Sequence, residues 1–361
     1  MLRTHISFER LFYVALNMIL KILDTGDEIC RYKDSIVVRF KGKRSVLSTA
    51  PICGGYRDDL AAVFNNDITN GEGSDIEIKL RAASYEEHMA LVSEELGLDP
   101  KFVAGLSTAA QMVNASIRSE AHGDLVVTTV VTGGIEVNGG RVGDPATWDE
   151  LAEMSAPIPD GTINIILHIN VGLTLGALTR AVVTCTEAKT AAIQELMAAG
   201  QYSTGLATGS GTDGVIVVAN AESDVVLTNT GNHSKLGELI GRTVKAAVKE
   251  ALYLQTGLSP ERQHDMWRRL ERFGMTPNRF WEEYERIADE RELNDCLTKD
   301  VFFAYAEKSA KQDRAVMLAS LYCHLLDQSM WGLLPSEEVL RVCDELLVMI
   351  AEIFRENSEQ K

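Results

Sequence analysis

An acidic residue among glycines is the strongest chemical signal in this sequence. The segment ATGSGTDGVIVVA at 207–219 places Gly209, Gly211 and Thr212 just before Asp213. Closely spaced glycines let backbone N–H groups approach an anion or a developing oxyanion, and an acid at the mouth of a strand can orient or activate water. A phosphate loop should open a helix, whereas this loop opens a predicted strand, which disfavours nucleotide binding. A plain glycine turn is the alternative.

A lysine interrupts the apolar stripe of a long predicted helix. Lys189 takes one place in a stripe whose other members are small or apolar: Leu178, Val182, Cys185, Ala192 and Leu196. Its stem could lie on apolar surface with the ammonium in water, or the lysine could be partly buried and polarise a carbonyl or pair with an acid such as Asp213. Glu187 is two residues away and therefore points to another side of the helix, in line with Arg180 and Thr184.

Other polar residues offer weaker signals. His233 precedes a helix for which Ser234 is a good N-cap, so it could contact a polar or anionic ligand group, or be a surface or capping histidine. Four hydroxyls in LSTAP and GLSTAA are candidate nucleophiles or turn hydroxyls: Ser48, Thr49, Ser107 and Thr108. The seven histidines and six cysteines show neither H-E-x-x-H nor C-x-x-C, so we expect no metal site.

Short strands and long helices alternate around these residues. The candidate strands are DSIVVRF, DLVVTTVV, TINIILHIN and GVIVVA, which are β-branched and bounded by Gly, Asp or Asn. The candidate helices run from Ser84 to Leu96, from Leu175 to Ala199 and from Lys235 to Leu254, the second with Thr174 as N-cap and Gly200 as stop. This mixture predicts an α/β or α+β layered domain with a mixed β-sheet.

A change of composition near Gly257 indicates a domain boundary. Only two of the 28 glycines lie beyond it, whereas three of the four tryptophans do. Helix starts follow at Ser259-Pro260, at Thr276-Pro277 and at Ser336, and the last helix repeats an apolar face: Val339, Cys343, Leu346, Ile350 and Ile353. We therefore predict one domain over 1–257 and an all-α helical bundle over 258–361. The bundle could serve homo-oligomerisation, docking of a protein partner or a lid.

Charge and composition exclude several classes of partner. A net charge of −17 opposes nucleic acid and anionic membrane surfaces, and the scattered cysteines are typical of reduced thiols in a cytoplasmic protein. The apolar stretch from Leu11 to Leu23 has the length of a signal-peptide core. Asn17 and Lys21 interrupt it, and we expect an amphipathic N-terminal helix instead. No run approaches the length of a membrane span.

Six blocks of sequence together resemble one known family. They are VLSTAPICGGY followed by Asn65 and Asn66, GLSTAAQMVNA, DGTINIILHIN, CTEAKTAAIQEL, ATGSGTDGVIVVA and GNHSKLGELIG. Their order and spacing over residues 36–252 resemble those of the adenosylcobinamide amidohydrolases. The arrangement of GTIN, long helix, glycine loop and strand is also similar to the fold of autoprocessing aminopeptidases and ornithine acetyltransferases, a fold-level hint of stacked sheets between helix layers.

The resemblance implies a reaction and a set of residues for it. The family removes the aminopropanol arm of adenosylcobinamide, or of a related cobamide, by amide hydrolysis and releases adenosylcobyric acid for corrinoid salvage or remodelling. No cofactor is required, because cobalt enters only as part of the corrinoid substrate. For hydrolysis we predict Asp213 as base or orienting group, Lys189 with the Gly209 to Gly211 backbone for the oxyanion, and Glu187 for proton transfer or positioning. We predict that the corrinoid is bound by Gly209, Gly211, Thr212, Asn114, Asn164 and His233.

Two other functions are compatible with the same sequence. One is a corrinoid-binding or carrier protein without hydrolysis, and the other is an amidohydrolase of the same fold that acts on another amide. Retention of Glu187, Lys189 and Asp213 favours the enzyme over the carrier.

Overall fold

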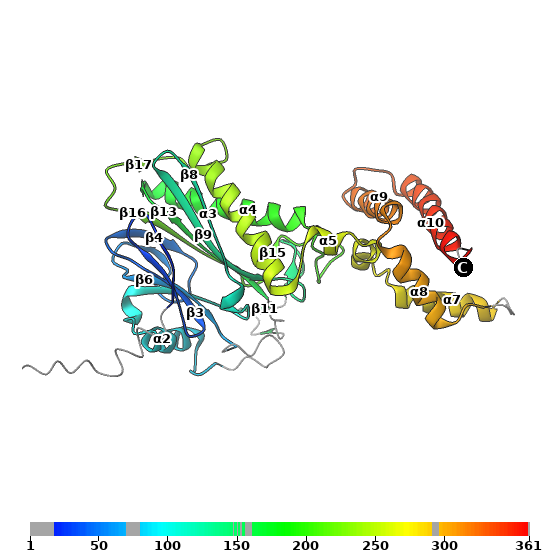
Figure 1. Cartoon of the computed structure of the whole chain (residues 1–361), viewed down its shortest axis with the longest axis horizontal. Helices are drawn as coiled ribbons and strands as arrows, with labels where there is room; N and C mark the ends of the chain where they lie inside the picture. Colours follow the sequence, from blue (N-terminus) through cyan, green and yellow to red (C-terminus); the bar gives the residue numbers. More distant parts are fainter. Residues whose placement is uncertain are drawn as a thin grey trace, which may run out of the picture. The chain divides into compact units, whose positions relative to one another are not determined.

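The computed structural model describes residues 18–69, 80–146, 148–149, 151, 154–155, 161–290 and 296–359. The chain forms two compact units (Figure 1). The larger unit comprises the residues up to Glu195 and Ala207–Leu258, and the helical unit comprises Leu196–Leu206 and Ser259–Lys361. The helical unit thus includes a segment, 196–206, that lies well before the predicted boundary at residue 257.

Two mixed sheets form the centre of the larger unit. The N-terminal sheet has the strand order β1-β2-β3-β6-β7, with bounds Met18–Ile22, Glu28–Tyr32, Ser35–Arg39, Ala62–Asp67 and Val103–Thr108. The central sheet has the order β5-β4-β16-β13-β9-β8, with bounds Gly55–Arg57, Arg44–Ser48, Gly214–Asn220, Thr162–Ile169, Leu125–Gly134 and Ser116–His122. Within these sheets β6 and β7 pair in parallel, as do β13 and β16, and the other pairs are antiparallel.

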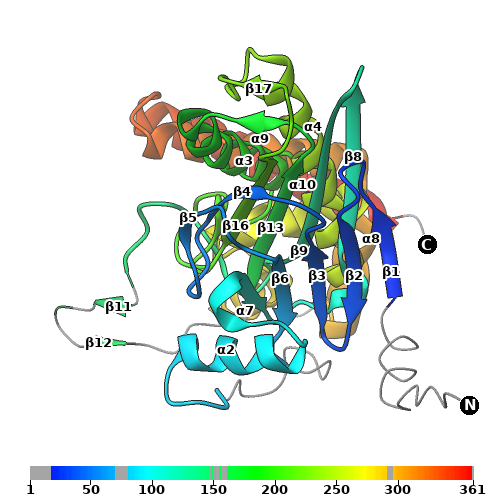
Figure 2. The same cartoon turned by 90° about the vertical axis from the view of Figure 1, so that its left-hand side faces the viewer.

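The two sheets stack face to face between helices. Apolar residues of both sheets share one buried cluster, which includes Ile36 and Val38 of β3 and Ile166 and Ile216 of the central sheet. Helix α2 (Tyr85–Glu95) packs on the outer face of the N-terminal sheet (Figure 2), and helices α3 (Leu175–Glu195) and α4 (Lys235–Thr256) cover the outer face of the central sheet. This order of layers confirms the predicted fold class, including stacked sheets between helix layers.

Short elements complete the larger unit. They are the 3-10 helices η1 (Pro100–Phe102) and η2 (Met112–Asn114) and the two-residue strands β10 (Gly139–Gly140), β11 (Trp148–Asp149), β12 (Met154–Ser155), β14 (Gly172–Leu173), β15 (Gly209–Ser210) and β17 (Val226–Leu227). Of these, β15 pairs with β10 and begins the glycine-rich loop that leads into β16. The loop is therefore fixed at both ends by strand pairing.

Most predicted elements of the larger unit are present. The four candidate strands correspond to β3, β9, β13 and β16, and the three candidate helices to α2, α3 and α4. Thr174 accepts a hydrogen bond from the backbone N–H of Ala177, as an N-cap does, although α3 ends at Glu195 rather than at the predicted Gly200.

The predicted N-terminal helix is wrong where the structure describes it. Residues 18–22 form β1, which pairs antiparallel with β2 through a tight turn in which Gly26 has a positive φ of 81°. Periodicity misled the prediction because an edge strand with one half-buried face can carry the same apolar residues as a short amphipathic helix. The remainder of the predicted segment, 11–17, lies outside the described residues.

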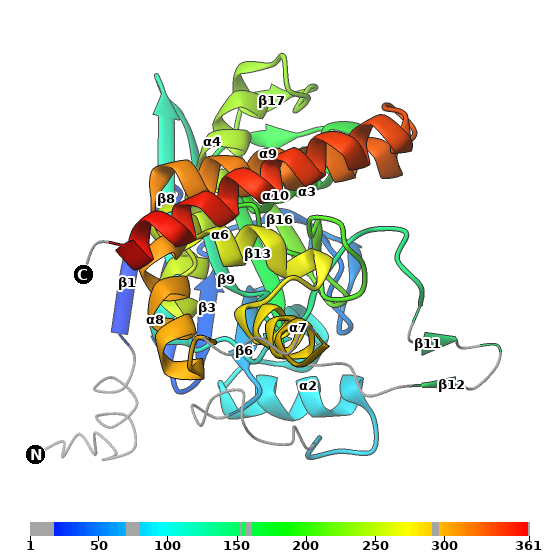
Figure 3. The same ribbon diagram turned by 90° about the vertical axis from the view of Figure 1, so that its right-hand side faces the viewer.

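The helical unit has its own apolar core. Its helices are α5 (Pro260–Gln263), α6 (Met266–Leu270), η3 (Glu271–Phe273), α7 (Pro277–Glu290), α8 (Lys299–Ala310), α9 (Asp313–Met330) and α10 (Ser336–Glu359). Helices α9 and α10 lie side by side (Figure 3), and the predicted apolar face of α10 is buried. Among the described residues no helix is long and apolar enough to cross a membrane.

The segment 196–206 is held by groups of the helical unit. The side-chain amide of Gln263 donates to the carbonyl oxygens of Leu196 (2.6 Å) and Met197 (3.0 Å), and the guanidinium of Arg272 donates to the carbonyl oxygen of Thr204. The chain therefore leaves the larger unit at the end of α3 and re-enters it just before β15.

Candidate active site

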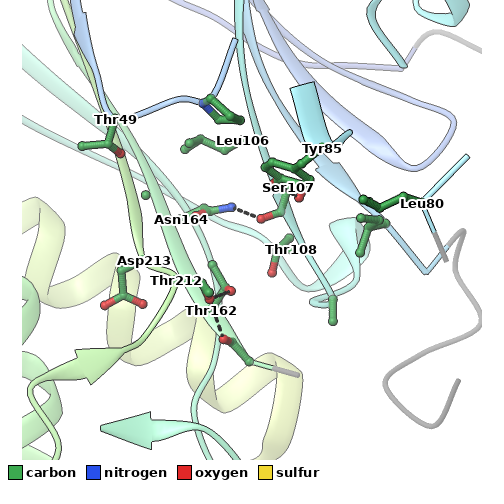
Figure 4. A pocket seen from close by; sticks show the side chains of 15 residues that line it. Thr49, Leu80, Tyr85, Leu106, Ser107, Thr108, Thr162, Asn164, Thr212 and Asp213 are labelled. Atoms are coloured by element: carbon green, nitrogen blue, oxygen red, sulfur yellow. Dashed lines mark hydrogen bonds between the residues drawn. The ribbon is translucent and has the colours of Figure 1, made fainter. Parts of the chain in front are cut away.

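A cavity of about 470 Å³ opens where strands of the two sheets end (Figure 4). Its polar wall comes from the central sheet and the glycine-rich loop, and includes Thr162, Asn164, Thr212 and Asp213. Its other wall comes largely from the N-terminal sheet and α2. The residues of that wall are Leu106, Ser107 and Thr108 of β7, with Ala109, Ile68, Leu80 and Tyr85. The volume is typical of a site for a small molecule or for part of a larger one.

Asp213 and Lys189 form a nearly buried ion pair at this cavity. Their side chains are 10% and 9% exposed, and the Lys189 ammonium donates to Oδ2 of Asp213. Asp213 directly precedes β16, so the pairing of β16 with β13 fixes its position along the sheet. Lys189 lies on the intact helix α3 and reaches Asp213 from the outer side of the sheet. Of the two alternatives for Lys189, the structure shows the lysine paired with Asp213.

Three further donors hold the Asp213 carboxylate. Oδ1 accepts from the backbone N–H of Ile163 (2.9 Å) and the hydroxyl of Ser210 (2.6 Å), and Oδ2 also accepts from the backbone N–H of Ser210 (3.1 Å). A carboxylate offers about four lone-pair positions, so these groups and Lys189 occupy all of them. The carboxylate is thereby fixed in one orientation, with both loop and lysine bound to it.

Gly209 is required by this arrangement. A Cβ atom there would lie 2.2 Å from Asp213 Oδ2 and 2.6 Å from Lys189 Nζ, whereas a Cβ at Gly211 would meet nothing within 4 Å. The two glycines of the loop are therefore not equivalent. Gly209 permits the close approach of the ion pair to the backbone, and Gly211 lies in open space.

Hydroxyl groups connect the cavity wall to Asp213. Thr162 and Thr212 share a short hydrogen bond, and Thr212 Oγ lies 3.1 Å from the carbonyl oxygen of Gly161 and 3.5 Å from Ser210 Oγ. The Ser210 hydroxyl in turn donates to Asp213. These contacts form a continuous line of hydroxyls that ends at the carboxylate.

Asn164 presents an amide oxygen to the cavity. Its side-chain N–H₂ donates to the carbonyl oxygen of Ser107 (2.7 Å) and to the amide oxygen of Asn65 (2.8 Å), and Asn65 donates onward to Thr132 (2.7 Å). The carbonyl of Ser107 can only accept, which fixes the orientation of both amides. Within the described ranges no hydrogen bond reaches Asn164 Oδ1, so this oxygen can accept one from a ligand.

The candidate hydroxyls of the two similar segments divide into two roles. Ser48 and Thr108 accept hydrogen bonds from the backbone N–H of Ala50 (2.8 Å) and Ala110 (3.0 Å), so both are turn hydroxyls, although Thr108 also borders the cavity. Thr49 and Ser107 line the cavity as well.

The Tyr85 phenol and the Cys185 thiol are both held in their protonated forms. Tyr85 forms a short hydrogen bond with Ser107, and burial raises the pKa of its phenol, which keeps the phenol protonated. Burial likewise raises the pKa of the Cys185 thiol, one turn from Lys189 on α3, to about 12. The described residues contain no group of three or more His, Cys, Asp or Glu that could hold a metal ion.

Comparison with known proteins identifies the family. Residues 21–260 match the family model described as adenosylcobinamide amidohydrolase. The chain belongs to this family. The match covers both sheets apart from the first residues of β1, together with the cavity, helices α2 to α4 and the segment 196–206, and it ends at the start of α5.

This family member is similar in sequence to a protein of another organism and has weak matches among solved structures. An uncharacterized protein of Methanocaldococcus jannaschii is 35% identical over 232 residues, which are 61% of this chain and 86% of that protein. Two solved structures each cover 65% of this chain and 82% of their own: the PH0078 protein of Pyrococcus horikoshii (12% identity, TM-score 0.30) and the L-aminopeptidase D-Ala-esterase/amidase of Ochrobactrum anthropi (10%, 0.29). Scores this low carry no argument about this chain.

The family member's cavity gathers some of the residues predicted from sequence and omits others. Asp213, Thr212 and Asn164 line it, and Lys189 and Gly209 lie directly behind Asp213. The N–H of Ser210 and the ammonium of Lys189, which we predicted for the oxyanion, both point at Asp213 instead.

Three predicted residues lie elsewhere in the larger unit. Glu187 is half exposed on α3, 3.9 Å from Arg180, and His233 is exposed ahead of α4. Asn114 donates to Gln255 of α4 (3.0 Å). None of the three is among the residues that line the cavity, and their roles remain predictions that the cavity geometry does not support.

Sequence reasoning missed Thr162 and Tyr85. Thr162 stands in the GTIN block, but a threonine at the start of a strand has no local signal that separates it from ordinary β-branched residues. Its meeting with Thr212 depends on the parallel pairing of β13 with β16, and Tyr85 reaches Ser107 only because α2 packs on the N-terminal sheet.

Proposed function

We propose that this protein hydrolyses the amide bond that joins the aminopropanol arm to the corrin of adenosylcobinamide, releasing adenosylcobyric acid and the arm for corrinoid salvage or remodelling. One observation carries the proposal beyond family membership. The cavity is lined by Asp213, which a buried lysine holds in place, and by the uncommitted amide oxygen of Asn164. The amide oxygen of Asn164 can orient an amide by accepting its N–H, and the Asp213 carboxylate can receive a proton through the hydroxyl of Ser210.

The size of the cavity suits one part of the substrate. A volume of about 470 Å³ can accommodate a short linear arm with its amide, and a complete corrin macrocycle with its side chains is larger. The arm would therefore enter while the corrin stays at the mouth. Inside, Asn164 Oδ1 would accept the N–H of the scissile amide, which places the amide carbon near Thr162 and Thr212.

An amide is a poor electrophile, so hydrolysis needs both an activated nucleophile and donors for the tetrahedral oxyanion. Asp213 provides the negative charge toward which a proton can move, and the Lys189 ammonium holds that carboxylate in position. No cofactor beyond the cobalt of the substrate itself is proposed. A cytoplasmic location and a partner or second copy bound through the helical unit remain predictions.

The test is incubation of purified protein with adenosylcobinamide and, separately, with adenosylated complete cobamides, followed by chromatography and mass spectrometry for adenosylcobyric acid. Product from either supports the proposal and identifies the substrate class. Tight binding without product would favour a carrier protein. If neither binding nor product is detected, the result would favour an amidohydrolase that acts on another amide.

A further inference from the structure

We propose that Thr162 is the nucleophile of this site and that its proton passes through the hydroxyls of Thr212 and Ser210 to Asp213. The inference rests on the proposed amide hydrolysis and names the group that attacks. It would make the reaction a two-step acyl transfer through an ester of Thr162 rather than a direct attack by water.

The direction of the hydroxyl protons carries the argument. The carbonyl of Gly161 can only accept, so Thr212 is the donor in their contact at 3.1 Å, and the same carbonyl also accepts from the side-chain amide of Asn138. Either hydroxyl could donate in the short hydrogen bond between Thr162 and Thr212, and Thr162 is the donor whenever Thr212 donates to Gly161. In that arrangement the lone pairs of Thr162 Oγ are left without a donor among the described residues, on a side chain that lines the cavity.

A small rotation completes the path to the carboxylate. If the Thr212 hydroxyl turns from Gly161 to Ser210 Oγ, 3.5 Å away, every hydroxyl donates to the next. The last proton already lies on the 2.6 Å bond from Ser210 to Asp213 Oδ1. The backbone N–H of Ile163 and the Lys189 ammonium hold that carboxylate in position while the protons move.

Two competing hydroxyls of the cavity lack such a path among the residues that the structure describes. Ser107 bonds to Tyr85, whose phenol is itself a proton donor with a raised pKa, and no described carboxylate follows it. Thr49 Oγ accepts the backbone N–H of Val215 (3.0 Å) and lies 3.4 Å from the carbonyl oxygen of the same residue. Of these three hydroxyls, Thr162 is the one whose described hydrogen bonds lead to a group that can take up a proton.

The atoms balance through both steps. Thr162 Oγ bonds to the amide carbon, the π pair moves to the carbonyl oxygen, and one proton arrives at Asp213 by three transfers. Collapse of the intermediate breaks the C–N bond, and the leaving nitrogen takes the proton back along the same hydroxyls. Water then attacks the ester, returns a proton to the chain, and releases the corrinoid acid with Thr162 restored.

A substrate-independent probe tests the nucleophile first. We would treat the wild-type protein with a small fluorophosphonate and map the modified residue by peptide mass spectrometry. We expect modification at Thr162, lost in Asp213→Asn, reduced at least tenfold in Ser210→Ala, and unchanged in Thr179→Val. Thr179 is an exposed threonine of α3 whose hydroxyl donates to Leu175 outside the cavity.

Turnover of adenosylcobinamide is the second measurement. We expect Thr162→Val to lose about 10³-fold in kcat with corrinoid binding and thermal unfolding retained, and Thr162→Ser to stay within about tenfold. Acid quench during turnover should show the acyl group on Thr162. Hydrolysis by wild-type protein with neither probe nor acyl group on Thr162, or near wild-type kcat in Thr162→Val, would overturn the inference. Labelled Thr162 without corrinoid hydrolysis would instead overturn the proposed function alone, and absence of both would overturn both.

Discussion

Two carboxylates lie near opposite ends of strand β13, and they differ in their surroundings: Asp213 lies near the start of the strand and Asp27 near its end. Near its start the cavity exposes Asp213, which Lys189 holds. Near its end Asp27 is fully buried, with Arg44 bound by two hydrogen bonds (2.7 and 2.8 Å) and His168 at 2.9 Å.

The two carboxylates are each held by a cationic side chain and further donors, but they serve different purposes. At Asp27, a guanidinium, an imidazole and the N–H of Lys41 satisfy a carboxylate that no ligand can reach. At Asp213, one donor is a hydroxyl that leads back to a cavity. We therefore expect damage at Asp27 to lower stability and damage at Asp213 to lower turnover. The following substitutions test that difference.

The largest effect should come from Asp213→Asn. Loss of the carboxylate removes the proton acceptor, for which general acid–base catalysis supplies 10² to 10⁴-fold, so kcat should fall by about 10³-fold. Corrinoid binding should survive, because Asn164 and the apolar walls are untouched. Steady-state kinetics with adenosylcobinamide and a binding titration measure both. Near wild-type turnover would refute any catalytic part for this residue.

The matched substitution at the fully buried carboxylate is Asp27→Asn. It leaves the buried Arg44 with only the exposed Glu222, 3.6 Å away, as an acidic partner among the described residues, and breaking a buried ion pair typically destabilises a protein by about 3 to 5 kcal/mol. The specific activity of the folded fraction should stay within about twofold of wild type. Urea denaturation gives the free energy of unfolding. A drop in kcat at unchanged stability would contradict the inference that Asp27 serves stability and Asp213 serves turnover.

Two neighbouring glycines sharpen the comparison within the site. A Cβ atom at Gly209 would clash with both members of the ion pair, and overpacking of this kind typically costs about 1 to 3 kcal/mol of stability. Because the clash displaces the carboxylate that accepts the proton, we also expect turnover to fall by about 10 to 100-fold. Gly211→Ala is the control and should remain within about twofold. Equal effects of the two substitutions would show that loop flexibility, rather than the ion pair, sets the rate.

Acid should reduce the contribution of Asp27 to the free energy of unfolding. Burial alone would raise the pKa of Asp27, but hydrogen bonds from His168 and Arg44 outweigh it and hold the pKa well below its usual value. Such a group stabilises the fold above the unfolded pKa, near 3.9, and this stability is lost as the pH falls toward the folded pKa. Between pH 5 and pH 3 the advantage of wild type over Asp27→Asn should shrink by about 1 kcal/mol in urea denaturation. A constant difference would contradict the assignment.

The smallest effects should come from two residues predicted to bind the corrinoid. Asn114→Ala removes a hydrogen bond to Gln255 and should cost about 1 kcal/mol of stability, and His233→Ala alters an exposed side chain. Neither should change KM for adenosylcobinamide more than about twofold. A tenfold rise in KM for His233→Ala would show that the corrinoid extends to the start of α4.

Local patterns predicted most elements of the larger unit and one residue of the site. Short β-branched runs bounded by Gly, Asp or Asn predicted β9, β13 and β16, and capping residues predicted the starts of α3 and α4. A charged residue in an apolar helical stripe singled out Lys189, but the pattern left open whether its ammonium reaches water or pairs with Asp213, and the structure shows the pair.

Contacts between distant strands could not be predicted in the same way. Thr162 meets Thr212, and Asn164 meets Asn65, through strand order and sheet stacking, which no local pattern encodes. The same gap explains Asn114 and His233. Sequence blocks of the family placed them near the reaction, whereas the fold places them outside the cavity wall.

The excursion of residues 196–206 into the helical unit has a consequence for anyone shortening this protein. A stop codon after Gly257 would delete Gln263 and Arg272, and with them the side-chain hydrogen bonds that hold this segment, which ends three residues before Gly209. Loss of activity in such a truncation would therefore report a damaged loop as readily as a missing partner surface. A minimal enzyme requires two edits, one that ends the chain after α4 and one that replaces the excursion with a short turn from α3 to β15.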